Sequence, residues 1–275
     1  MLSIIIAHRN RNIILDRLLK SAQMSNLPRY KHEIIIVDLS SDIKLSNKYK
    51  DLNLSFDNIN YKGTFWKTKA LNRGVSLSSY DNIMILDSDS LINDKFFDFV
   101  FNYLNTVNRS YKLCHRVVYL DKINDIICDH VDKNNKEEFN KVLKSSYGSL
   151  RVARERFTEN ENVYSFKKDN DITCNKSLGN SHFTMLKSDF IKIGGYDERF
   201  IGHGYEDLDF NLRAFRFLKK GYLCTDFCNL VFHQNHDYES SWLMEKTQRE
   251  NKEIYRYNSI NNISVIEKNK DWGKF

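Results

Sequence analysis

Two aspartates separated by a single residue, Asp87 and Asp89, come directly after the apolar run 82–86. Carboxylates spaced in this way at the end of a strand can share one hard divalent cation. That cation would in turn bind the two phosphates of a nucleoside diphosphate. Short acidic turns are common, and this pair becomes a candidate site because it follows a buried strand of a predicted parallel sheet.

Two histidines, His233 and His236, follow the apolar residues 230–232. One imidazole together with two carboxylates suits Mn²⁺ or a similar divalent ion. A histidine pair alone is more often an ordinary surface feature, and it gains weight here because the Asp87/Asp89 pair lacks a third ligand. We therefore expect a metal site of Asp87, Asp89 and His233, which directly follows the apolar strand, with His236 as a candidate fourth ligand.

A glycine-rich and acidic stretch from Gly194 to Asp209 forms a third group. Its glycines allow the backbone to come close to a ligand. Glu206 and Asp207 fall in the first turn of an expected helix, where the helix dipole favours ionised carboxylates. An ionised Asp207 could act as a general base for a sugar hydroxyl. The alternative is that these acidic side chains only complement the positive end of the helix.

The apolar pattern indicates which elements carry these groups. Continuous apolar runs predict buried strands, and a 3.6-residue period predicts the helices between them. The expected strands are 2–8, 33–38 and 82–87, and the expected helices are 11–24, 66–77, 94–107, 136–147 and 206–218, the last with Leu208, Leu212, Phe215 and Leu218 facing inward. This alternation is typical of an α/β fold with a mainly parallel central sheet flanked by helices. Residues 8–11, Asp38 and 87–89 should then meet at the carboxyl edge of the sheet.

The length of 275 residues fits one large domain. We expect this domain at 1–240, with an insertion at about 110–180, and a C-terminal helical tail at 241–275. Residues 120–180 are polar and weakly periodic, which favours an acceptor-binding or lid segment over the site. No apolar run reaches the roughly 18 residues of a membrane-spanning helix, and the apolar N-terminus is too short for a signal peptide.

The net charge of +6 is spread along the chain, so we expect no nucleic-acid partner. Phosphate-bearing substrates, an anionic membrane surface or an ordinary solvated surface would each explain it. Five irregularly spaced cysteines favour reduced thiols and a cytoplasmic protein. The basic tail with Trp242 permits peripheral contact with the inner face of a membrane, and a helix packed on the domain is the alternative. The oligomeric state stays open.

The run from Gly194 to Arg213 is similar to the C-terminal motif of the β-1,4-galactosyltransferases and of bacterial capsule-polymerising glycosyltransferases of the GT-A, family-2 type. Other landmarks follow in the same order. Residues 7–11 resemble the F-R-N-R turn that contacts the nucleotide, and residues 69–74 resemble the K-A-x-N-x-G helix. Asp38 resembles the acid that holds uracil, residues 87–89 match the D-x-D motif, and His233 resembles the metal histidine of the bacterial members.

This resemblance implies a GT-A, Rossmann-like fold, a UDP-sugar donor, Mn²⁺ or Mg²⁺, and inversion at the anomeric carbon. It implies Asp207 as the catalytic base and Glu206 as its acceptor-orienting neighbour. The implied donor-binding residues are His8, Arg9, Arg11, Asp38, Lys69, Asn72, Asp87, Ser88 and Gly204, and the implied acceptor-binding residues are His203, Tyr205 and Glu206. The acceptor would be a glycan or a lipid-linked saccharide of a bacterial surface polysaccharide.

The sequence departs from the family pattern at two positions. Leu39 stands where many relatives have a second acid, and His203 stands where the animal enzymes have tryptophan. The sequence leaves two other classes open, namely a non-catalytic scaffold that binds sugar nucleotides or glycans, and a nucleotidyltransferase. The second class usually has a glycine-rich phosphate loop after the first strand, whereas residues 7–11 contain no glycine.

Overall fold

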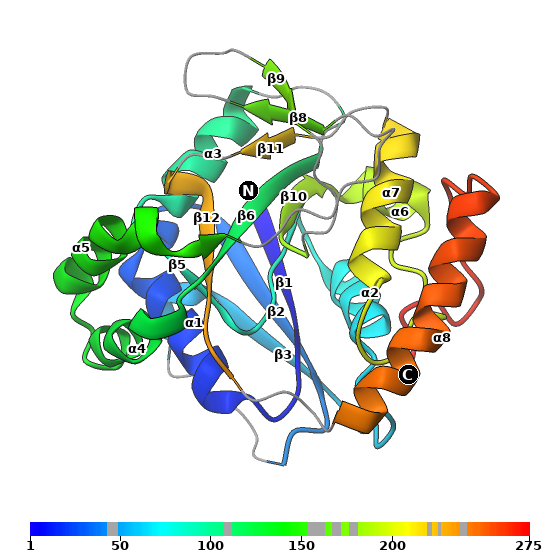
Figure 1. Cartoon of the computed structure of the whole chain (residues 1–275), viewed down its shortest axis with the longest axis horizontal. Coiled ribbons are helices and arrows are strands. Elements are labelled where there is room, and N and C mark those ends of the chain that lie inside the picture. The colour runs from blue at the N-terminus through cyan, green and yellow to red at the C-terminus, as the bar shows by residue number, and fades with distance from the viewer. Residues whose placement is uncertain are drawn as a thin grey trace.

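A computed structural model of the chain describes residues 1–42, 49–106, 110, 112–152, 163–166, 172–175, 181–218, 222–224, 227–236 and 241–275 (Figure 1). The first half contains β1 (Leu2–His8), α1 (Asn12–Met24), β2 (His32–Leu39), β3 (Leu54–Ile59), α2 (Lys67–Leu77), β4 (Asn82–Ile85), β5 (Ser90–Ile92), α3 (Phe96–Thr106) and β6 (Lys112–Tyr119). These elements follow the predicted alternation of strands and helices closely.

The second half of the chain contains shorter strands and the C-terminal helices. Its elements are α4 (Asn124–Asp132), α5 (Lys136–Ser146), β7 (Arg151–Val152), β8 (Val163–Phe166), β9 (Ile172–Asn175), β10 (Phe183–Leu186), α6 (Lys187–Ile193), α7 (Glu206–Leu218), β11 (Tyr222–Cys224), β12 (Leu230–His233) and α8 (Ser241–Ile260). Short 3-10 turns lie at Leu27–Arg29, Lys50–Leu52, Asp121–Ile123, Tyr147–Ser149 and Phe227–Asn229. The helices expected at 136–147 and 206–218 are confirmed.

The main sheet has the strand order β3-β2-β1-β4-β10-β6-β11-β8-β9. Strands β1 to β4 pair in parallel, and β10 runs antiparallel to both β4 and β6. A small second sheet places β12 between β5, to which it is antiparallel, and β6, to which it is parallel. The mainly parallel sheet is confirmed, and two late segments of the chain lie beside earlier ones, β10 beside β4 and β12 beside β5.

Both faces of the sheet are buried, as the unbroken apolar strands predict. In β1, Ile4 and Ile6 pack into a cluster with α1 and α3, whereas Ile5 and Ala7 pack into a cluster with α2, α6 and α7. Figure 1 shows the sheet between these two groups of helices. Helix α2 lies so close to β1 that a Cβ atom at Gly74 would overlap the side chain of Ile5. This packing fixes where the N-terminus of α2 lies relative to the sheet edge.

The buried face of α7 differs from the predicted one. Leu212 is buried as expected, whereas Leu208, Phe215 and Leu218 are only partly buried. The fully buried positions include Arg213, whose guanidinium donates to Asp209 at 2.7 Å and to the carbonyl of Gly195 at 2.9 Å. A buried charge is tolerated when it is paired and hydrogen-bonded. Apolar periodicity does not predict this buried face, because the ion pair of Arg213 and Asp209 occupies part of it.

The segment expected as an insertion, about 110–180, begins with β6, which lies in the middle of the sheet between β10 and β11. Helices α4 and α5 follow, and most of 153–180 lies outside the described residues. The start of this segment therefore belongs to the framework of the fold. The division into a domain, an insertion and a tail stays a prediction.

The C-terminal part forms one long helix and a returning segment. Helix α8 packs against α7, and residues 261–275 run back to α2 and the loop 194–198. Within the described ranges, no helix is both long and apolar enough to cross a membrane. Within the described structure, Cys114 and Cys128 are buried and take part in no disulfide bond.

Candidate functional site

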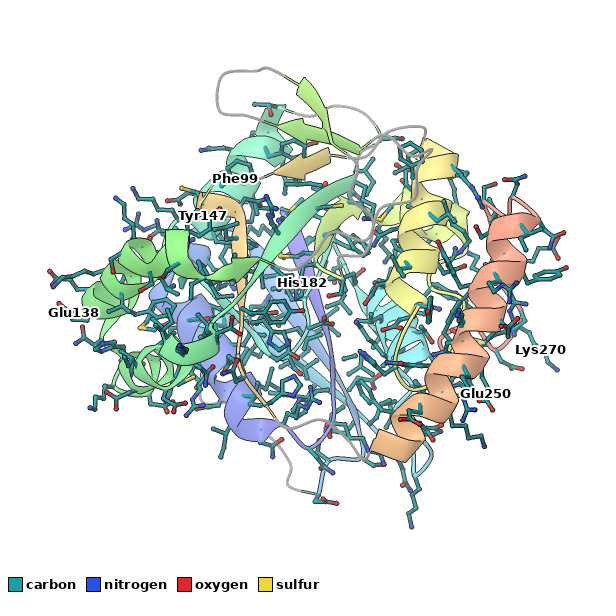
Figure 2. The ribbon with its side chains drawn as sticks, viewed as in Figure 1. Phe99, Glu138, Tyr147, His182, Glu250 and Lys270 are labelled. Carbon is teal, nitrogen blue, oxygen red and sulfur yellow. The ribbon has the colours of Figure 1, made fainter. Side chains whose placement is uncertain are left out.

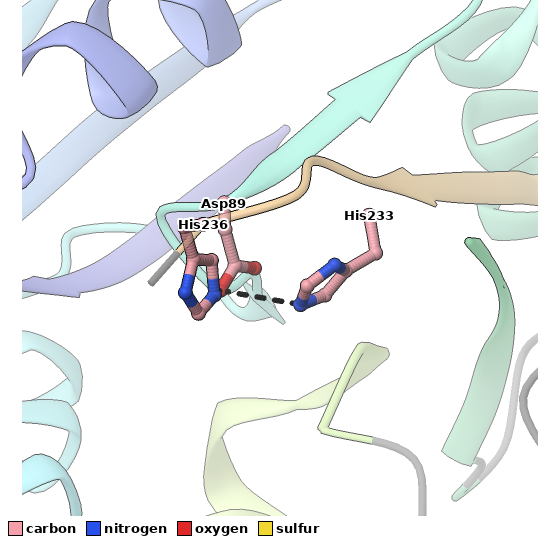
Figure 3. A group of neighbouring side chains, drawn as sticks. All are labelled: Asp89, His233 and His236. Atoms are coloured by element: carbon pink, nitrogen blue, oxygen red, sulfur yellow. Dashed lines mark hydrogen bonds and ion pairs between the residues drawn. The ribbon is translucent and has the colours of Figure 1, made fainter. Parts of the chain in front are cut away.

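The Asp89 carboxylate meets both predicted histidines. Its Oδ2 atom lies 3.0 Å from Nε2 of His236 and 3.6 Å from Nε2 of His233, as Figure 3 shows. Its Oδ1 atom is buried and has no hydrogen-bond partner among the described residues. Carboxylate and imidazole donors within a few ångströms of one another fit a divalent cation, and an unpartnered buried oxygen strengthens the fit. These three residues form the first candidate metal site.

Strand pairing explains why residues so far apart in sequence meet here. Strand β12 runs antiparallel to β5, and this register puts His233 opposite Ser90, the residue after Asp89. The backbone N–H of Gln234 then donates to the carbonyl of Asp89 at 2.9 Å. Sequence reasoning favoured His233 over His236, whereas the shorter distance to Asp89 belongs to His236.

A relay of hydrogen bonds holds Asp87. Ser181 donates to Asp87 Oδ2 at 2.5 Å, so its oxygen accepts from Nδ1–H of His182 at 3.0 Å. Nε2 of His182 then accepts from the hydroxyl of Ser90 at 2.9 Å. Burial lowers the pKa of His182, which agrees with a neutral ring in this relay. In Figure 2, His182 lies near the centre of the fold, at the start of β10.

His182 also belongs to a second candidate metal group with Asp87 and Asp89. Sequence reasoning missed this histidine, which lies just after the expected insertion at about 110–180. The available signal was a polar Ser181-His182 pair placed directly before the apolar strand Phe183–Leu186. A buried histidine at the start of a strand needs polar partners, and here these partners include the candidate site.

Lys67, the first residue of α2, joins three carboxylates. Its Nζ atom lies 3.0 Å from Asp87, 3.1 Å from Asp207 and 3.7 Å from Glu206. Burial alone would lower the pKa of Lys67, but these three negative charges more than compensate and raise it well above its ordinary value. Sequence reasoning missed Lys67 and chose Lys69 from the same helix.

Asp207 lies at the start of α7 in an unusual electrostatic setting. Burial raises its pKa to about 6, the neighbouring charges of Glu206 and Asp87 add to the effect, and Lys67 opposes it. The hydroxyl of Tyr196 donates to Asp207 Oδ1 at 3.1 Å. Glu206 is also buried, and its Oε2 atom has no partner among the described residues. The single positive charge of Lys67 does not balance the negative charges of three carboxylates, so the pKa of Asp207 stays above that of an ordinary aspartate.

The turn before α7 requires a special backbone. Gly202, Gly204 and Tyr205 have φ angles of 75°, 102° and 69°, in the left-handed region that favours glycine. The positive φ of Tyr205 costs conformational energy and helps turn the chain into the helix. This turn leaves His203 exposed and buries Glu206.

The loop after β1 supplies Arg9 and Arg11. Arg11 Nη1 lies 3.2 Å from His236 Nε2 and 3.5 Å from Asp89 Oδ2, beside the first metal group. Arg9 donates to the carbonyl of Gly63 at 2.5 Å. The structure therefore brings Arg11 to the metal group, whereas Arg9 contacts the segment at Gly63.

His8 and Asp38 are opposite each other on β1 and β2, as the parallel sheet predicts. Nε2 of His8 contacts Asn12 Oδ1 at 2.8 Å, and burial lowers the pKa of this histidine. The Asp38 carboxylate accepts hydrogen bonds from the backbone and hydroxyl of Ser41. Both side chains are buried at the predicted edge of the sheet.

Two predicted residues on α2 lie apart from the carboxylates. The ammonium of Lys69 lies over the rings of Trp66 and Phe275, at 4.5 and 5.5 Å from their centroids. The Asn72 amide is fully buried and bonds to Tyr196 and Glu198. The roles expected for Lys69, Asn72, Ser88 and Gly204 in donor binding stay predictions.

Comparison with known families gives one clear match. The family described as "Glycosyltransferase like family 2" matches residues 1–235. No curated protein matches the sequence. The matched range includes the three strand ends, the Asp87–Asp89 pair, the start of α7 and His233.

Several solved structures share the fold. TarS from S. aureus, solved with UDP-GlcNAc, has a TM-score of 0.62 and 14% identity, covering 86% of this chain and 59% of that chain. The mannosyltransferase PcManGT from Pyrobaculum calidifontis, solved with GDP-Man and Mn²⁺, has a TM-score of 0.55 and 12% identity, covering 94% and 64%. Glucosyl-3-phosphoglycerate synthase from Mycobacterium tuberculosis, solved with Mn²⁺, UDP and glucosyl-3-phosphoglycerate, has a TM-score of 0.54 and 10% identity, covering 97% and 81%.

These identities are low, so the likeness establishes the fold alone. The fold is GT-A, as the resemblance in the sequence implied. The chain spans less than two thirds of the length of these TarS and PcManGT chains. The match to a β-1,4-galactosyltransferase-type motif stays a prediction.

Proposed function

The chain belongs to the glycosyltransferase like family 2, and from this premise we propose that it transfers a hexose or N-acetylhexosamine from a UDP-sugar to a glycan hydroxyl, with inversion. The observation that carries the proposal is the position of Lys67 between Asp87 and Asp207. One ammonium within 3.1 Å of both carboxylates brings the expected donor side and the expected base together. A direct displacement needs the donor and the base close together, because the attacking hydroxyl and the leaving diphosphate act on the same anomeric carbon.

On the donor side, Asp89, His233 and His236 would hold Mn²⁺ or Mg²⁺, with Asp87 beside them. When bound, this ion would neutralise the negative charge that develops on the departing diphosphate. Arg11 would contact the phosphates, because a guanidinium matches phosphate oxygens in a bidentate way. Asp38, His8 and Arg9 are the proposed contacts of uracil and ribose.

On the acceptor side, Asp207 would take the proton from the attacking hydroxyl. A pKa of about 6 leaves the carboxylate ionised at neutral pH yet more basic than an ordinary aspartate. Tyr196 and Lys67 fix its orientation, and the unpartnered Oε2 of Glu206 is available to a second acceptor hydroxyl. His203 and Tyr205 are the proposed edge of the acceptor site.

The acceptor that we propose is a glycan or a lipid-linked saccharide of a bacterial surface polysaccharide. The reaction is a single displacement without a covalent glycosyl-enzyme. No residue other than Asp207 is required as a base. The support for the surface-polysaccharide role is the resemblance in the sequence.

The test measures UDP release with Mn²⁺ and a panel of UDP-sugars. Asp207→Asn should lower turnover by about 10²- to 10⁴-fold, the range expected for losing a general base, while UDP binding is kept. Asp125→Asn, at an exposed site on α4, is the matched control. Wild-type turnover in Asp207→Asn would contradict the base assignment. No release from any donor would favour a non-catalytic binding module.

A further inference from the structure

We propose that Arg11 competes with the divalent cation for the same two ligand atoms, so that cation and nucleotide diphosphate bind tightly only together. This inference rests on the proposed function, because it concerns the same metal site. It assigns Arg11 a second action besides contacting the donor.

Arg11 already bridges the atoms that a cation would need. Its Nη1 atom is 3.2 Å from His236 Nε2 and 3.5 Å from Asp89 Oδ2, and these two atoms are themselves 3.0 Å apart. With the ring proton on Nδ1, the lone pair of His236 Nε2 accepts an N–H of Arg11, and a metal would need this same lone pair. Arg11 and a divalent ion therefore exclude each other at His236.

The position of Arg11 makes this contact easy to exchange. Its side chain is 33% exposed and pairs with one carboxylate, whereas Lys67 is 13% exposed and pairs with three. A partly exposed ion pair at 3.5 Å contributes little stability. Arg11 also lies in the loop directly before α1 and has no side-chain role in capping that helix. Arg11 can therefore leave Asp89 and His236 at little cost in stability.

A diphosphate offers Arg11 a better partner than Asp89 does. Two phosphate oxygens can accept both N–H groups of the guanidinium fork, and this charge-assisted pairing is stronger than a single long contact. Once Arg11 turns to the phosphates, Asp89 Oδ2 and His236 Nε2 are released for the cation. Binding of the nucleotide diphosphate thus raises the affinity for the cation, and by thermodynamic linkage the cation raises the affinity for the diphosphate equally.

The test is a titration of Mn²⁺ followed by the electron paramagnetic resonance signal of the free ion. It compares wild type with Arg11→Gln, each without and with UDP. Arg11→Gln should bind Mn²⁺ about tenfold more tightly than wild type without UDP, within the range typical of site coupling. It should also bind UDP more weakly and lose most of the mutual enhancement. Unchanged or weaker Mn²⁺ binding by Arg11→Gln without UDP would overturn the inference.

Two further variants make the result specific. Arg17→Gln, on helix α1 that follows Arg11 and paired with Asp132, should bind Mn²⁺ like wild type. Asp89→Asn should lose Mn²⁺ binding. If Asp89→Asn binds Mn²⁺ normally, the metal site of the proposed function is wrong, and the competition fails with it. If Asp89→Asn loses binding while Arg11→Gln gains none, only the competition by Arg11 is wrong.

Discussion

The site has two halves, and in each of them one basic side chain forms ion pairs with one or more carboxylates. The Lys67 half contains Lys67, Asp87, Glu206 and Asp207, and the Arg11 half contains Arg11, Asp89, His233 and His236. In the Lys67 half, a single buried ammonium serves three carboxylates. In the Arg11 half, a more exposed guanidinium meets one carboxylate and an imidazole.

The difference between the halves lies in charge balance and burial. The Lys67 half keeps an excess of negative charge out of water, which raises the pKa of Asp207 to about 6. The Arg11 half combines a carboxylate with imidazoles, the donor set that suits a divalent metal. In the proposed reaction, the first half is suited to proton transfer and the second to holding the diphosphate. Three changes would break or sharpen this comparison.

Replacing Lys67 should have the largest effect. Lys67→Met leaves buried carboxylates without their counter-charge, which should lower the free energy of unfolding by about 3 kcal/mol. Turnover should fall by about a hundredfold or more, because Asp207 loses a fixed electrostatic contact. Thermal melts and initial rates of UDP release measure both effects.

The matched control is Lys69→Met, in the same helix two positions later, whose ammonium lies over Trp66 and Phe275. It should change turnover far less than Lys67→Met does. Equal losses in the two variants would show that general damage to α2, rather than the ion cluster, explains the effect.

Removing one carboxylate from the Lys67 half should shift the pH profile. An Asp207 with a pKa of about 6 loses its base form as the pH falls, so the acid limb of wild-type kcat/KM should have its midpoint near pH 6. Glu206→Gln removes a nearby negative charge and should move this midpoint to lower pH. An unmoved or raised midpoint would argue against Asp207 as the titrating group.

The C-terminal segment provides the smallest test, because it contacts the loop 194–198, which carries Tyr196, the hydrogen-bond donor to Asp207. Trp272 donates to the carbonyl of Gly194 at 3.0 Å, and Gly273 N donates to Glu198 at 2.7 Å. Trp272→Ala should destabilise the fold by about 2 kcal/mol, since the ring is only partly buried. The acceptor KM should rise a few-fold, within the effect of a small misplacement.

Mn²⁺ binding by Trp272→Ala should stay at the wild-type level. This readout separates a local effect on the acceptor side from a loss of the whole site. A matching loss of Mn²⁺ affinity would mean that the two halves are coupled more strongly than their separate contacts suggest.

Some contacts at the site follow from local patterns, and others do not. Strand β4 and the start of α7 at Glu206 could be predicted from apolar runs and helix signals, although β4 ends at Ile85, two residues before the predicted end at 87. The choice between Lys67 and Lys69 could not. Successive helical residues are 100° apart, so two positions differ by about 200° in direction. Only the packing of α2 on β1 decides which lysine points to the carboxylates.

The sequence by itself determined the α/β framework, the acidic strand end and the residue types available for a cation and a base. These follow from periodicity and from side-chain chemistry, which act over a few residues. The tertiary structure decided that Lys67 joins Asp87 to Asp207, that His182 supports Asp87 through Ser181, and that Arg11 shares the ligands of Asp89. Those contacts join segments separated by tens to hundreds of residues, and strand register and helix packing alone bring them together.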